Sequence, residues 1–306
     1  MRDVISNFLA DKASIDNNFF VLSGDHGYAL FDQIRKKAPD QFINTGVTEQ
    51  AMVGCAAGMA KTGKKIVLYG LACFIPMRVL EFIKMNICYE NLPIIILGDG
   101  AGTIYTTLGA SHQCGEDLAC LKTLPIKIFS PADKHEMKLC LEMASTLQMP
   151  SYIRIGKSDK PTVHASLTSL TAFISLLKTT SKTAIFATGS MVCTGLDLAK
   201  KHNLSLYSCP ILNFYDSKEI VTALKEFENI ITLEEHSVHG GLGSIFADLI
   251  AENGLHLKLT KFGITKYFTK GCGSYEYAIK FHNLDFDFIE EKIKNLGLIS
   301  SHNNAV

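Results

Sequence analysis

The sequence has no excess of charge of either sign. Its 30 Lys and Arg residues balance 30 Asp and Glu residues, so the formal net charge is zero. A neutral chain offers no broad electrostatic field to a nucleic-acid backbone or an anionic membrane surface, and any anion must be held by a few local residues. We therefore expect neither a nucleic acid nor a membrane as partner.

Long apolar segments and metal-binding motifs are also missing. No run approaches the roughly 18 apolar residues of a membrane span, and the opening residues, 1–4, lack the features of a signal peptide. The nine cysteines include no Cys-x-x-Cys pair, and the ten histidines include no His-Glu-x-x-His pattern. We expect a cytoplasmic protein with reduced thiols and no metal ion held by this chain alone.

What is present is the composition of an ordinary globular protein, with 47% hydrophobic and 20% charged residues over 306 positions. Short β-branched apolar runs alternate with helix-period stretches, which predicts strands joined by crossover helices in largely parallel sheets. The expected strands cover residues 19–22, 65–69, 94–97, 126–129, 152–155, 183–187, 204–208, 230–233 and 257–260. The expected helices cover residues 51–61, 77–89, 116–123, 134–148, a segment near Ala199, 217–227 and 242–252.

A polar sequence at residues 158–162 interrupts this alternation, and a second series of strands and helices follows it. We therefore predict an α/β protein of two domains, residues 1–165 and 183–306, joined by a linker over residues 166–182. The last residues, 300–306, contain Ser and Asn, and we expect them to be frayed.

One acidic residue, Glu49, stands at the start of a predicted helix that is rich in small residues, including Gly54, Ala57 and Gly58. An acid at this place can simply complement the helix dipole. Two features favour a function instead. Open α/β sheets bind ligands at the carboxyl ends of parallel strands, and small residues let another helix approach closely. An acid desolvated at such an interface can hold or share a proton near neutrality.

This segment begins an ordered series of motifs. Gly46 to Gln50 is followed by Phe74 to Arg78, Gly109 to Gln113, Pro131 to Asp133, Pro150 to Arg154, and Leu233 to His236 with Gly240 to Gly243. The series resembles the pyrimidine-binding and C-terminal domains of the transketolases and, more distantly, of deoxyxylulose-phosphate synthase. Because the chain starts where the pyrimidine-binding domain of a full-length transketolase starts, it resembles the small subunit of a split, two-gene transketolase.

The resemblance implies a thiamine-diphosphate-dependent transferase, which moves a two-carbon ketol unit from a ketose or ketose phosphate donor to an aldehyde acceptor. It also implies a separately encoded diphosphate-binding subunit, in an α2β2 assembly that self-associates through the pyrimidine-binding domain.

The family holds Mg²⁺ and the diphosphate on a Gly-Asp-Gly stretch followed roughly 25 to 30 residues later by Asn. Gly98-Asp99-Gly100 occurs here, but an apolar segment, 121–129, stands where the Asn is needed. We therefore interpret this stretch as unrelated to metal binding and expect the partner subunit to hold Mg²⁺.

Individual residues take expected roles from the family. Glu49 matches the acid that hydrogen-bonds the aminopyrimidine ring of the cofactor and activates it, and Phe74 matches an aromatic residue that packs on that ring. Asp25 and Arg78 match positions at the cofactor pocket. His112 matches a histidine that contacts the donor oxygens beside the reacting carbon. Without the family context, each of three residues has an ordinary structural interpretation. Phe74 can be a core residue, Asp25 can be a turn residue, and His112 can be a surface residue.

Two basic residues are expected to bind substrate. Arg154 and Lys157 follow a predicted strand, and Lys157 stands where the family carries an arginine for the terminal phosphate. A lysine lacks the bidentate fork of arginine, so phosphate recognition should be looser. The alternative is that both are exposed basic groups at a domain boundary.

Two positions depart from the family pattern. Leu108 replaces an Asp that reads a donor hydroxyl, and Gly100 replaces a His that faces phosphate or hydroxyl oxygens. Both changes remove polar recognition of a sugar, and such recognition discriminates strongly between substrates. The sequence thus favours a deoxygenated, nucleotide-linked or otherwise modified sugar over the standard pentose phosphates.

Two other functions fit parts of the sequence. The β-subunit of a 2-oxoacid dehydrogenase has the same domain order, but the motif around His112 and the context of Glu49 resemble the sugar enzymes more closely. A non-catalytic assembly subunit would explain Leu108 and Gly100 as lost chemistry, yet such a subunit has no physical need for Glu49 at an interface.

The second domain carries few candidate groups. Glu234, Glu235 and His236 form its main polar cluster. We interpret them as capping residues, with a role at a subunit interface as the alternative.

Overall fold

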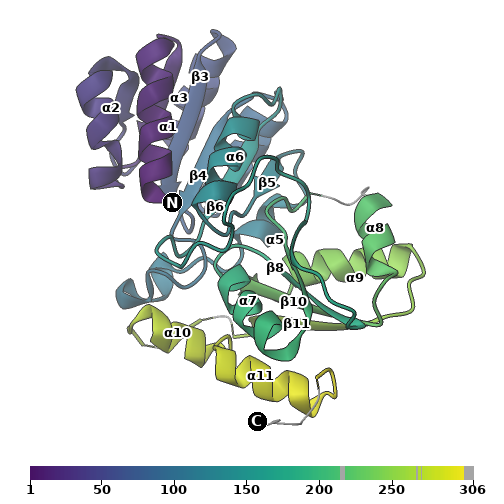
Figure 1. Ribbon diagram of the computed structural model, residues 1–306. Coiled ribbons are helices and arrows are strands. Elements are labelled where there is room, and N and C mark those ends of the chain that lie inside the picture. Colours follow the sequence, from purple (N-terminus) through teal and green to yellow (C-terminus); the bar gives the residue numbers. More distant parts are fainter. Residues whose placement is uncertain (214–217, 267, 270, 300–306) are drawn as a thin grey trace.

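The computed structural model describes residues 1–213, 218–266, 268–269 and 271–299. They form two α/β domains, each built around its own sheet, with the first domain in the purple to teal part of Figure 1 and the second in the green to yellow part. The predicted fold class is confirmed. Among the described helices, none is long and apolar enough to cross a membrane.

The first sheet contains six parallel strands in the order β2-β1-β3-β4-β6-β5. Its strands are β1 (Phe19–Ser23), β2 (Phe42–Asn44), β3 (Lys65–Leu71), β4 (Ile95–Asp99), β5 (Lys127–Phe129) and β6 (Ser151–Ile155). Its helices are α1 (Arg2–Ile15), α2 (Asp32–Lys37), α3 (Glu49–Lys61), α4 (Leu80–Phe82), α5 (Asp117–Leu121) and α6 (Lys134–Ala144). Shorter turns are η1 (Tyr28–Phe31), η2 (Pro39–Gln41), the π-helix η3 (Ile83–Cys88), η4 (Thr106–Leu108) and η5 (Ala110–His112).

Helices cover both faces of this sheet, which explains why its strands are nearly continuous apolar runs. One apolar cluster packs α1, α2 and α6 against the sheet, and another packs α3 and η3 against the opposite face. Helix α1 was not expected from the sequence, although Ile5, Leu9 and Ala13 recur every fourth residue and all three are buried. The helix expected over 77–89 is replaced by turns up to residue 79, followed by α4 and η3.

The second sheet contains five strands in the order β11-β10-β8-β9-β7, and only β7 runs antiparallel to its neighbour. Its strands are β7 (Ile174–Leu177), β8 (Thr183–Ala187), β9 (Ser205–Ser208), β10 (Asn229–Ser237) and β11 (Lys258–Ile264). Its helices are α7 (Met191–His202), α8 (Lys218–Leu224), α9 (Leu242–Glu252), α10 (Tyr275–Phe281) and α11 (Phe286–Asn295).

Several details of this domain differ from expectation. Strand β7, a short and half-exposed edge strand, lies inside the stretch 166–182 that was expected to be a linker. Helices α10 and α11 were not expected. The expected start of a helix at residue 217 and the tail 300–306 lie outside the described residues.

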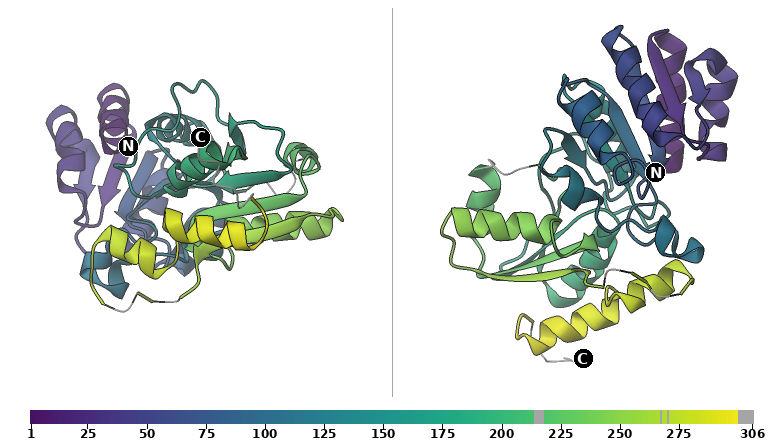
Figure 2. Two further views of the ribbon diagram at one scale, coloured as in Figure 1. Left: turned by 60° about the horizontal axis from the view of Figure 1, so that its bottom comes forward. Right: turned by 180° about the vertical axis from the view of Figure 1, so that it is seen from behind.

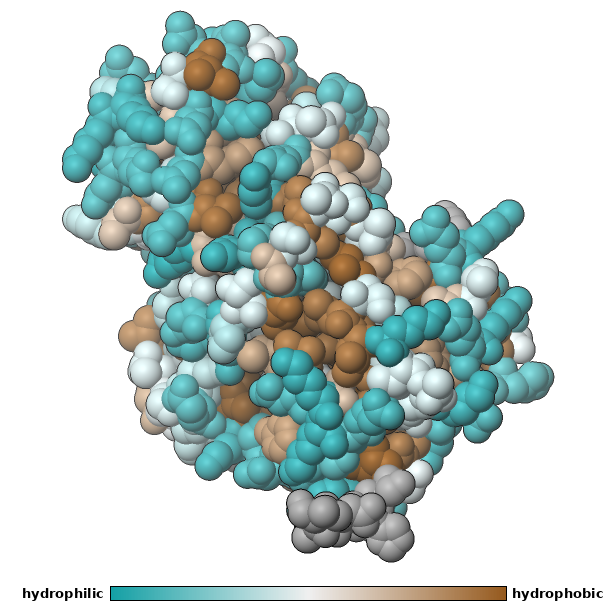
Figure 3. All heavy atoms as spheres, in the orientation of Figure 1, coloured by the Kyte–Doolittle hydropathy of each residue, from teal (hydrophilic) through white to brown (hydrophobic). Residues whose placement is uncertain are grey.

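The two domains share one core. A single apolar cluster contains Leu118 and Ile128 of the first domain together with Phe186 and Tyr207 of the second. Figure 2 shows the sheets packed next to each other, with the yellow helices α10 and α11 along the outer side of the second sheet. In Figure 3, brown apolar side chains gather near the middle of the molecule while most of the remaining face is polar. The first domain therefore presents its strand ends beside the second domain.

Candidate active site

The candidate residues converge at the carboxyl ends of the parallel strands. Asp25 follows β1, Phe74 follows β3, and Asp99 ends β4. Glu49 is the first residue of α3, whose N-terminal end therefore points to the same edge of the sheet. This is the edge at which open α/β sheets place their ligands.

Glu49 is a buried acid with only half of its carboxylate satisfied. Its side chain is 2% exposed, and Oε2 lies 2.9 Å from Nη1 of Arg78. Oε1 is buried and has no hydrogen-bond partner among the described residues. Leaving a buried acceptor unpaired costs about 1 to 3 kcal/mol. A ligand that donates one hydrogen bond to Oε1 would remove that cost.

Phe74 forms the centre of the cluster. The guanidinium carbon of Arg78 lies 4.2 Å from the centre of its ring. The ring of His112 meets it edge-on at 5.4 Å, and the ring of His26 lies at 6.0 Å in a tilted orientation. The structure thus brings Glu49, Phe74, Arg78 and His112 together, as a common site requires.

His26 is a member of this site that sequence reasoning missed. Its Nε2 is buried and unpartnered within the described part of the chain. Burial lowers the pKa of His26, against the opposing effect of the Glu49 and Asp25 charges, so a neutral ring is favoured. Its position directly after Asp25 at a strand end is the signal that could have identified it.

Asp25 and His112 are held by short polar contacts. Asp25 adopts a left-handed backbone conformation with φ of 63°, and its Oδ1 accepts a hydrogen bond from Nδ2 of Asn44 at 2.9 Å. Its side chain is exposed to solvent. Nδ1 of His112 lies 3.0 Å from the hydroxyl of Ser111, so Nε2 is the ring nitrogen not engaged in this contact.

The Gly98-Asp99-Gly100 stretch is internally occupied. Oδ2 of Asp99 accepts hydrogen bonds from Tyr69 at 2.6 Å and Tyr105 at 3.1 Å, and it pairs with Arg2 at 3.4 Å. Gly100 has φ of 71°, and a Cβ there would collide with the Tyr105 ring. The space that a side chain at position 100 needs is therefore filled by Tyr105, a second residue that sequence reasoning missed.

Arg154 lies in the domain interface and not in an open site. Its side chain is 2% exposed, its Nε donates to both oxygens of Asp117 at 2.9 and 3.1 Å, and its Nη2 donates to the carbonyl of Glu235 at 2.7 Å. Both the Asp117 and Glu235 charges raise the pKa of Arg154 against the effect of burial. The expected role of Arg154 in substrate binding stays a prediction without support from this geometry.

Lys157 and Leu108 lie near the second domain. Nζ of Lys157 pairs with Asp159 at 3.0 Å and lies 5.3 Å from the ring centre of Tyr275, the first residue of α10. Leu108 ends η4, which packs against α10, and its side chain is 55% exposed. An exposed leucine presents carbon, and no hydrogen-bond acceptor, to anything bound at this loop.

The polar cluster of the second domain serves two tasks. The Glu234 carboxylate accepts hydrogen bonds from the backbone N–H groups of Leu242 and Gly243 at 2.7 and 2.8 Å, which caps α9. Glu235 reaches the first domain, where it accepts hydrogen bonds from the backbone N–H and the hydroxyl of Thr103 at 2.8 and 2.9 Å. His236 is fully buried between Glu234 and Asp117.

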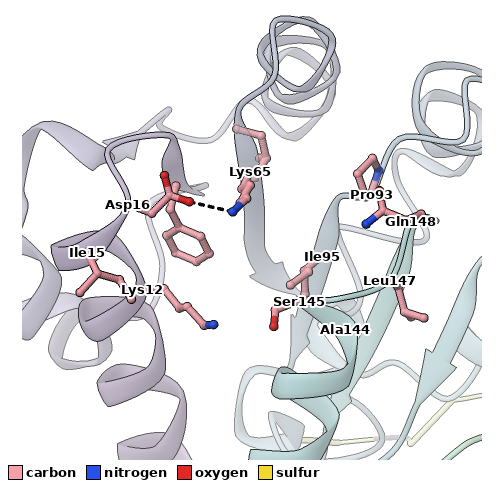
Figure 4. A pocket seen from close by; sticks show the side chains of 12 residues that line it. Lys12, Ile15, Asp16, Lys65, Pro93, Ile95, Ala144, Ser145, Leu147 and Gln148 are labelled. Carbon is pink, nitrogen blue, oxygen red and sulfur yellow. Dashed lines mark hydrogen bonds and ion pairs between the residues drawn. The ribbon is translucent and has the colours of Figure 1, made fainter.

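A cavity lies at the opposite edge of the first sheet, away from the candidate site. It has a volume of about 250 Å³, and Figure 4 shows it between the end of α1, the start of β3 and the end of α6. The ion pair of Asp16 and Lys65, at 2.8 Å, lies in its wall. Because Phe19, Lys65 and Ile95 begin their strands, this cavity is at the amino ends and remote from Glu49.

The described residues contain no group of three or more His, Cys, Asp or Glu side chains placed to hold a metal ion. The donor set at Asp99 is already used by two tyrosines and an arginine. What the site offers is a hydrogen-bond acceptor, an aromatic ring and two histidines, which suits an organic ring with a protonated nitrogen.

Comparison with known proteins agrees with this arrangement. Residues 1–162 match the transketolase pyrimidine-binding domain, and residues 174–278 match the transketolase C-terminal domain. The fold and site thus define one section of a thiamine-diphosphate-dependent transferase. The chain belongs to the transketolase family.

The similar proteins include several that are themselves sections of a transketolase. The chain is 31% identical to a subunit of the apulose-4-phosphate transketolase of Actinobacillus succinogenes, covering 83% of this chain and 84% of that protein. It is also 31% identical to a putative transketolase C-terminal section of Methanocaldococcus jannaschii, covering 89% and 87%. A solved structure described as a split gene transketolase, inactive β4 tetramer, superposes with a TM-score of 0.85 at 26% identity and 98% coverage of both chains.

Longer relatives are matched over part of their length. The 1-deoxy-D-xylulose-5-phosphate synthase of Neisseria meningitidis is 26% identical over 95% of this chain but only 46% of that protein. The chain therefore corresponds to the C-terminal section of these longer proteins, in agreement with the resemblance noted in the sequence.

Proposed function

We propose that this chain is the catalytic small subunit of a split transketolase, which transfers a two-carbon ketol unit from a ketose phosphate donor to an aldehyde. The observation that carries the proposal is the unpaired Oε1 of Glu49, buried beside Phe74. A structural acid at a helix start would be satisfied by the helix or by water, whereas this oxygen is buried and bonds to no group in the described part of its own chain.

The residues present fit the pyrimidine half of thiamine diphosphate. Glu49 Oε1 would accept a hydrogen bond from a protonated ring nitrogen, Phe74 would pack on the ring, and Asp25 and Arg78 would border it. When bound, the cofactor supplies the electron sink for breaking a carbon–carbon bond. His112 Nε2, which is not engaged by Ser111, would donate a hydrogen bond to an oxygen of the donor.

Binding at this site requires Arg78 to adjust. Its guanidinium pairs with Glu49 and covers the Phe74 ring, and both are groups that the cofactor would contact. Arg78 is itself exposed to solvent, so its side chain can move at little cost. In the chain alone Arg78 occupies Glu49 Oε2, and it would have to make room for the ring.

We further propose that the diphosphate and Mg²⁺ lie on a partner subunit, because Asp99 is already occupied by Tyr69, Tyr105 and Arg2. Helix α3 supports self-association. Gly54 and Gly58 are exposed. Within the described structure, no heavy atom from outside this helix lies within 4 Å of the position that a Cβ atom would take at either glycine. The adjoining η3 segment exposes Met85 and, at its end, Tyr89. An α2β2 assembly is the expected form, and the described β4 tetramer of the solved relative makes a self-associating small subunit reasonable.

The substrate is proposed to be a modified sugar phosphate. Leu108 presents carbon to the loop, and the Tyr105 ring fills the space at Gly100 while its hydroxyl is bonded to Asp99. Hydrogen bonds to the hydroxyl groups of ordinary pentose phosphates are therefore lost. Two of the similar proteins are named as subunits of apulose-4-phosphate transketolases, which supports a sugar phosphate outside the common pentose series.

The test is reconstitution with a candidate partner, a separately produced diphosphate-binding subunit of a transketolase. The chain alone should show no turnover, and the mixture with thiamine diphosphate and Mg²⁺ should transfer ketol units, with apulose 4-phosphate preferred to xylulose 5-phosphate. Ordinary transketolase rates with xylulose 5-phosphate would contradict the substrate assignment. Pyruvate decarboxylation with lipoamide reduction would instead identify the 2-oxoacid dehydrogenase alternative, and assembly without any turnover would identify an assembly subunit.

A further inference from the structure

A pocket between the two domains is lined by none of the residues to which the proposed reaction gives a role. It has a volume of about 340 Å³, within the range of small-molecule sites. Residues of both domains line it, among them Met77, Gln113 and Glu116 from the first and Ile264, Phe268 and His282 from the second. The second domain has no assigned role at the active site, so its contribution to this wall requires a separate explanation.

His282 lines the pocket and carries an unsatisfied polar atom. Its side chain is 2% exposed, and its Nε2 lies 2.8 Å from the hydroxyl of Thr269. Its Nδ1 is buried and has no hydrogen-bond partner in the described part of the chain. Burial, assisted by the Lys266 charge, lowers the pKa of His282, so the ring is neutral and Nδ1 either donates or accepts according to the tautomer.

Gln113 supplies a second unsatisfied group. Its Nε2 is also buried without a partner among the described residues. Glu116 adds a carboxylate, one oxygen of which accepts a hydrogen bond from the backbone N–H of Gly115 at 3.0 Å. Buried polar atoms are nearly always hydrogen-bonded, so two unpaired groups in the wall of one pocket indicate a missing ligand.

The lining also defines the chemistry of that ligand. Of the described residues that line the pocket, none is Lys or Arg, and Glu116 contributes a negative charge. A phosphate or carboxylate would therefore be repelled. A hydroxyl group can donate to Glu116, accept from Gln113, and pair with either tautomer of His282. Met77, Ile264 and Phe268 provide apolar contact for a carbon chain.

We propose that this interdomain pocket binds an uncharged, hydroxyl-rich small molecule, of the size of a short polyol or sugar, through His282, Gln113 and Glu116. Gln113 directly follows His112, and Cys73, which also lines the pocket, directly precedes Phe74. Occupation of the pocket therefore acts on the same loops that carry the active-site residues. The same chemistry belongs to the uncharged end of a substrate and to a separate effector.

The binding test uses the full chain without cofactor or partner, so its result is independent of the proposed reaction. Xylitol is titrated while the NMR signals of the His282 ring are followed, with the assignment taken from His282→Gln. A saturable shift is expected. Gln113→Leu should weaken the affinity about 2- to 10-fold, because it removes one hydrogen bond. Xylitol 5-phosphate should bind more weakly than xylitol, because Glu116 repels it.

His239→Gln is the matched control, because His239 is exposed and outside the pocket lining; its affinity for xylitol should equal that of the unmodified chain. Should His282→Gln fail to fold, Gln113→Leu decides alone, since Gln113 is partly exposed and its amide nitrogen makes no bond in the described structure. A titration with no saturable shift, equal affinity in Gln113→Leu, or equal affinity for xylitol 5-phosphate would overturn the proposal.

A second arm distinguishes the two sources of ligand in the active complex with the partner subunit. If xylitol raises KM for the donor without changing kcat, the pocket receives the uncharged end of the substrate. If xylitol changes kcat at saturating donor, the pocket receives a separate effector. Both results support the site and differ only in what occupies it.

Discussion

At position 49, a single carboxylate oxygen distinguishes a catalytic subunit from a structural one. Oε2 of Glu49 is bound by Arg78, which leaves Oε1 for a ligand. The proposed chemistry depends on this one acceptor, because the neighbouring ring groups are Phe74 and two histidines that contact it at ring-centre distances of 5.4 and 6.0 Å.

We predict that Glu49→Gln lowers turnover of the reconstituted complex by at least about 100-fold, the usual contribution of a positioned acid or base. Assembly, measured by size-exclusion chromatography, should be unchanged. Glu81→Gln, at an exposed position of α4, is the control and should retain full activity. Turnover of Glu49→Gln within about twofold of the unmodified complex would refute the catalytic assignment, because the loss expected for a catalytic acid or base is about 100-fold.

We predict that a substitution at Leu108 changes donor selectivity. Leu108→Asp restores an acceptor at an exposed position, so kcat/KM for xylulose 5-phosphate should rise about tenfold relative to the preferred donor, equivalent to about 1.4 kcal/mol. Leu108→Met keeps an apolar side chain of similar size and should leave the ratio unchanged. Equal ratios in both variants would show that this position does not read the sugar.

At the scale of elements, the second domain holds the loop that carries His112. Glu235 of β10 accepts two hydrogen bonds from Thr103, near the start of that loop, and a further one from the hydroxyl of Tyr275 at 2.7 Å. A Cβ at Gly102 would collide with Glu235 Oε1, so the loop and the carboxylate are in direct contact. This contact is a positioning role for the C-terminal domain.

Glu235→Gln should therefore loosen residues 102–113. Hydrogen bonds to a charged group contribute about 1.5 to 3 kcal/mol, so amide hydrogen exchange in this segment should accelerate by roughly 10- to 100-fold. Exchange in α1 should not change, and Glu252→Gln, at the exposed end of α9, should leave the loop as it is. If residues 102–113 exchange at an unaltered rate in Glu235→Gln, the hydrogen bonds between Thr103 and Glu235 do not control the loop.

At the scale of the whole molecule, buried charged groups join the two domains. Arg154 is bound on one side by Asp117 and on the other by the carbonyl of Glu235. Glu136 of α6 accepts a hydrogen bond from Ser208 of β9 at 2.6 Å. Because these groups are buried, each is more costly to break than a surface pair.

Arg154→Met leaves Asp117 as an uncompensated buried charge. The free energy of unfolding should fall by about 3 to 5 kcal/mol, measured by urea denaturation. Lys138→Met, on the exposed side of α6, should change it by less than about 0.5 kcal/mol. A loss below about 1 kcal/mol for Arg154→Met would mean that the pair does not hold the interface, because a buried pair broken on one side costs several times more.

Glu136 makes stability depend on pH. Burial raises the pKa of Glu136 to about 7, above the value of about 4.3 for an exposed Glu. The folded chain then binds the proton more tightly than the unfolded chain, so stability contributed by Glu136 is lost as the pH rises from about 4.5 to about 7. His164, whose pKa is raised by the Asp133 hydrogen bond against the effect of burial, acts in the same direction.

Glu136→Gln removes this titration. Between pH 5 and 7 the unmodified chain should lose up to about 3 kcal/mol relative to the variant, measured as urea midpoints at each pH. Burial lowers the pKa of His236 to about 4, so its contribution to stability increases as the pH rises. This contribution is the same in both proteins and cancels when the unmodified chain is compared with the variant. Parallel pH profiles of the two proteins would contradict the assignment.

Local patterns predicted part of this protein well. Five of the six strands of the first sheet are apolar runs whose period and length are readable directly, whereas the short edge strand β2 was not predicted. Glu49, Phe74 and His112 each belong to a contiguous motif. Strand β7 and helices α10 and α11 were not predicted. Strand β7 is a short edge strand, whereas α11 does carry a periodic apolar face, with Ile289 and Ile293 buried four residues apart, so the sequence held a signal for it. Their places depend on contacts with other elements.

The residues that the sequence did not identify are those whose roles arise from distant partners. Tyr105 fills the space at Gly100 through a bond to Asp99, and His26 joins the site through contact with Phe74. Arg154 was assigned to substrate from its position after a strand, but its side chain is buried between the domains. Sequence spacing does not report which side of a strand end faces a neighbouring domain.

The sequence by itself determined the α/β class, the order of the two domains, the transketolase family and the motif that carries Glu49, because each of these depends on residues close together in the chain. Only the tertiary structure decided that Glu49 keeps one oxygen unpaired, that Asp99 is already occupied, and that Glu235 and Arg154 join the domains. Those facts depend on burial and on contacts between residues as many as 132 positions apart, and such contacts exist only after the chain has folded.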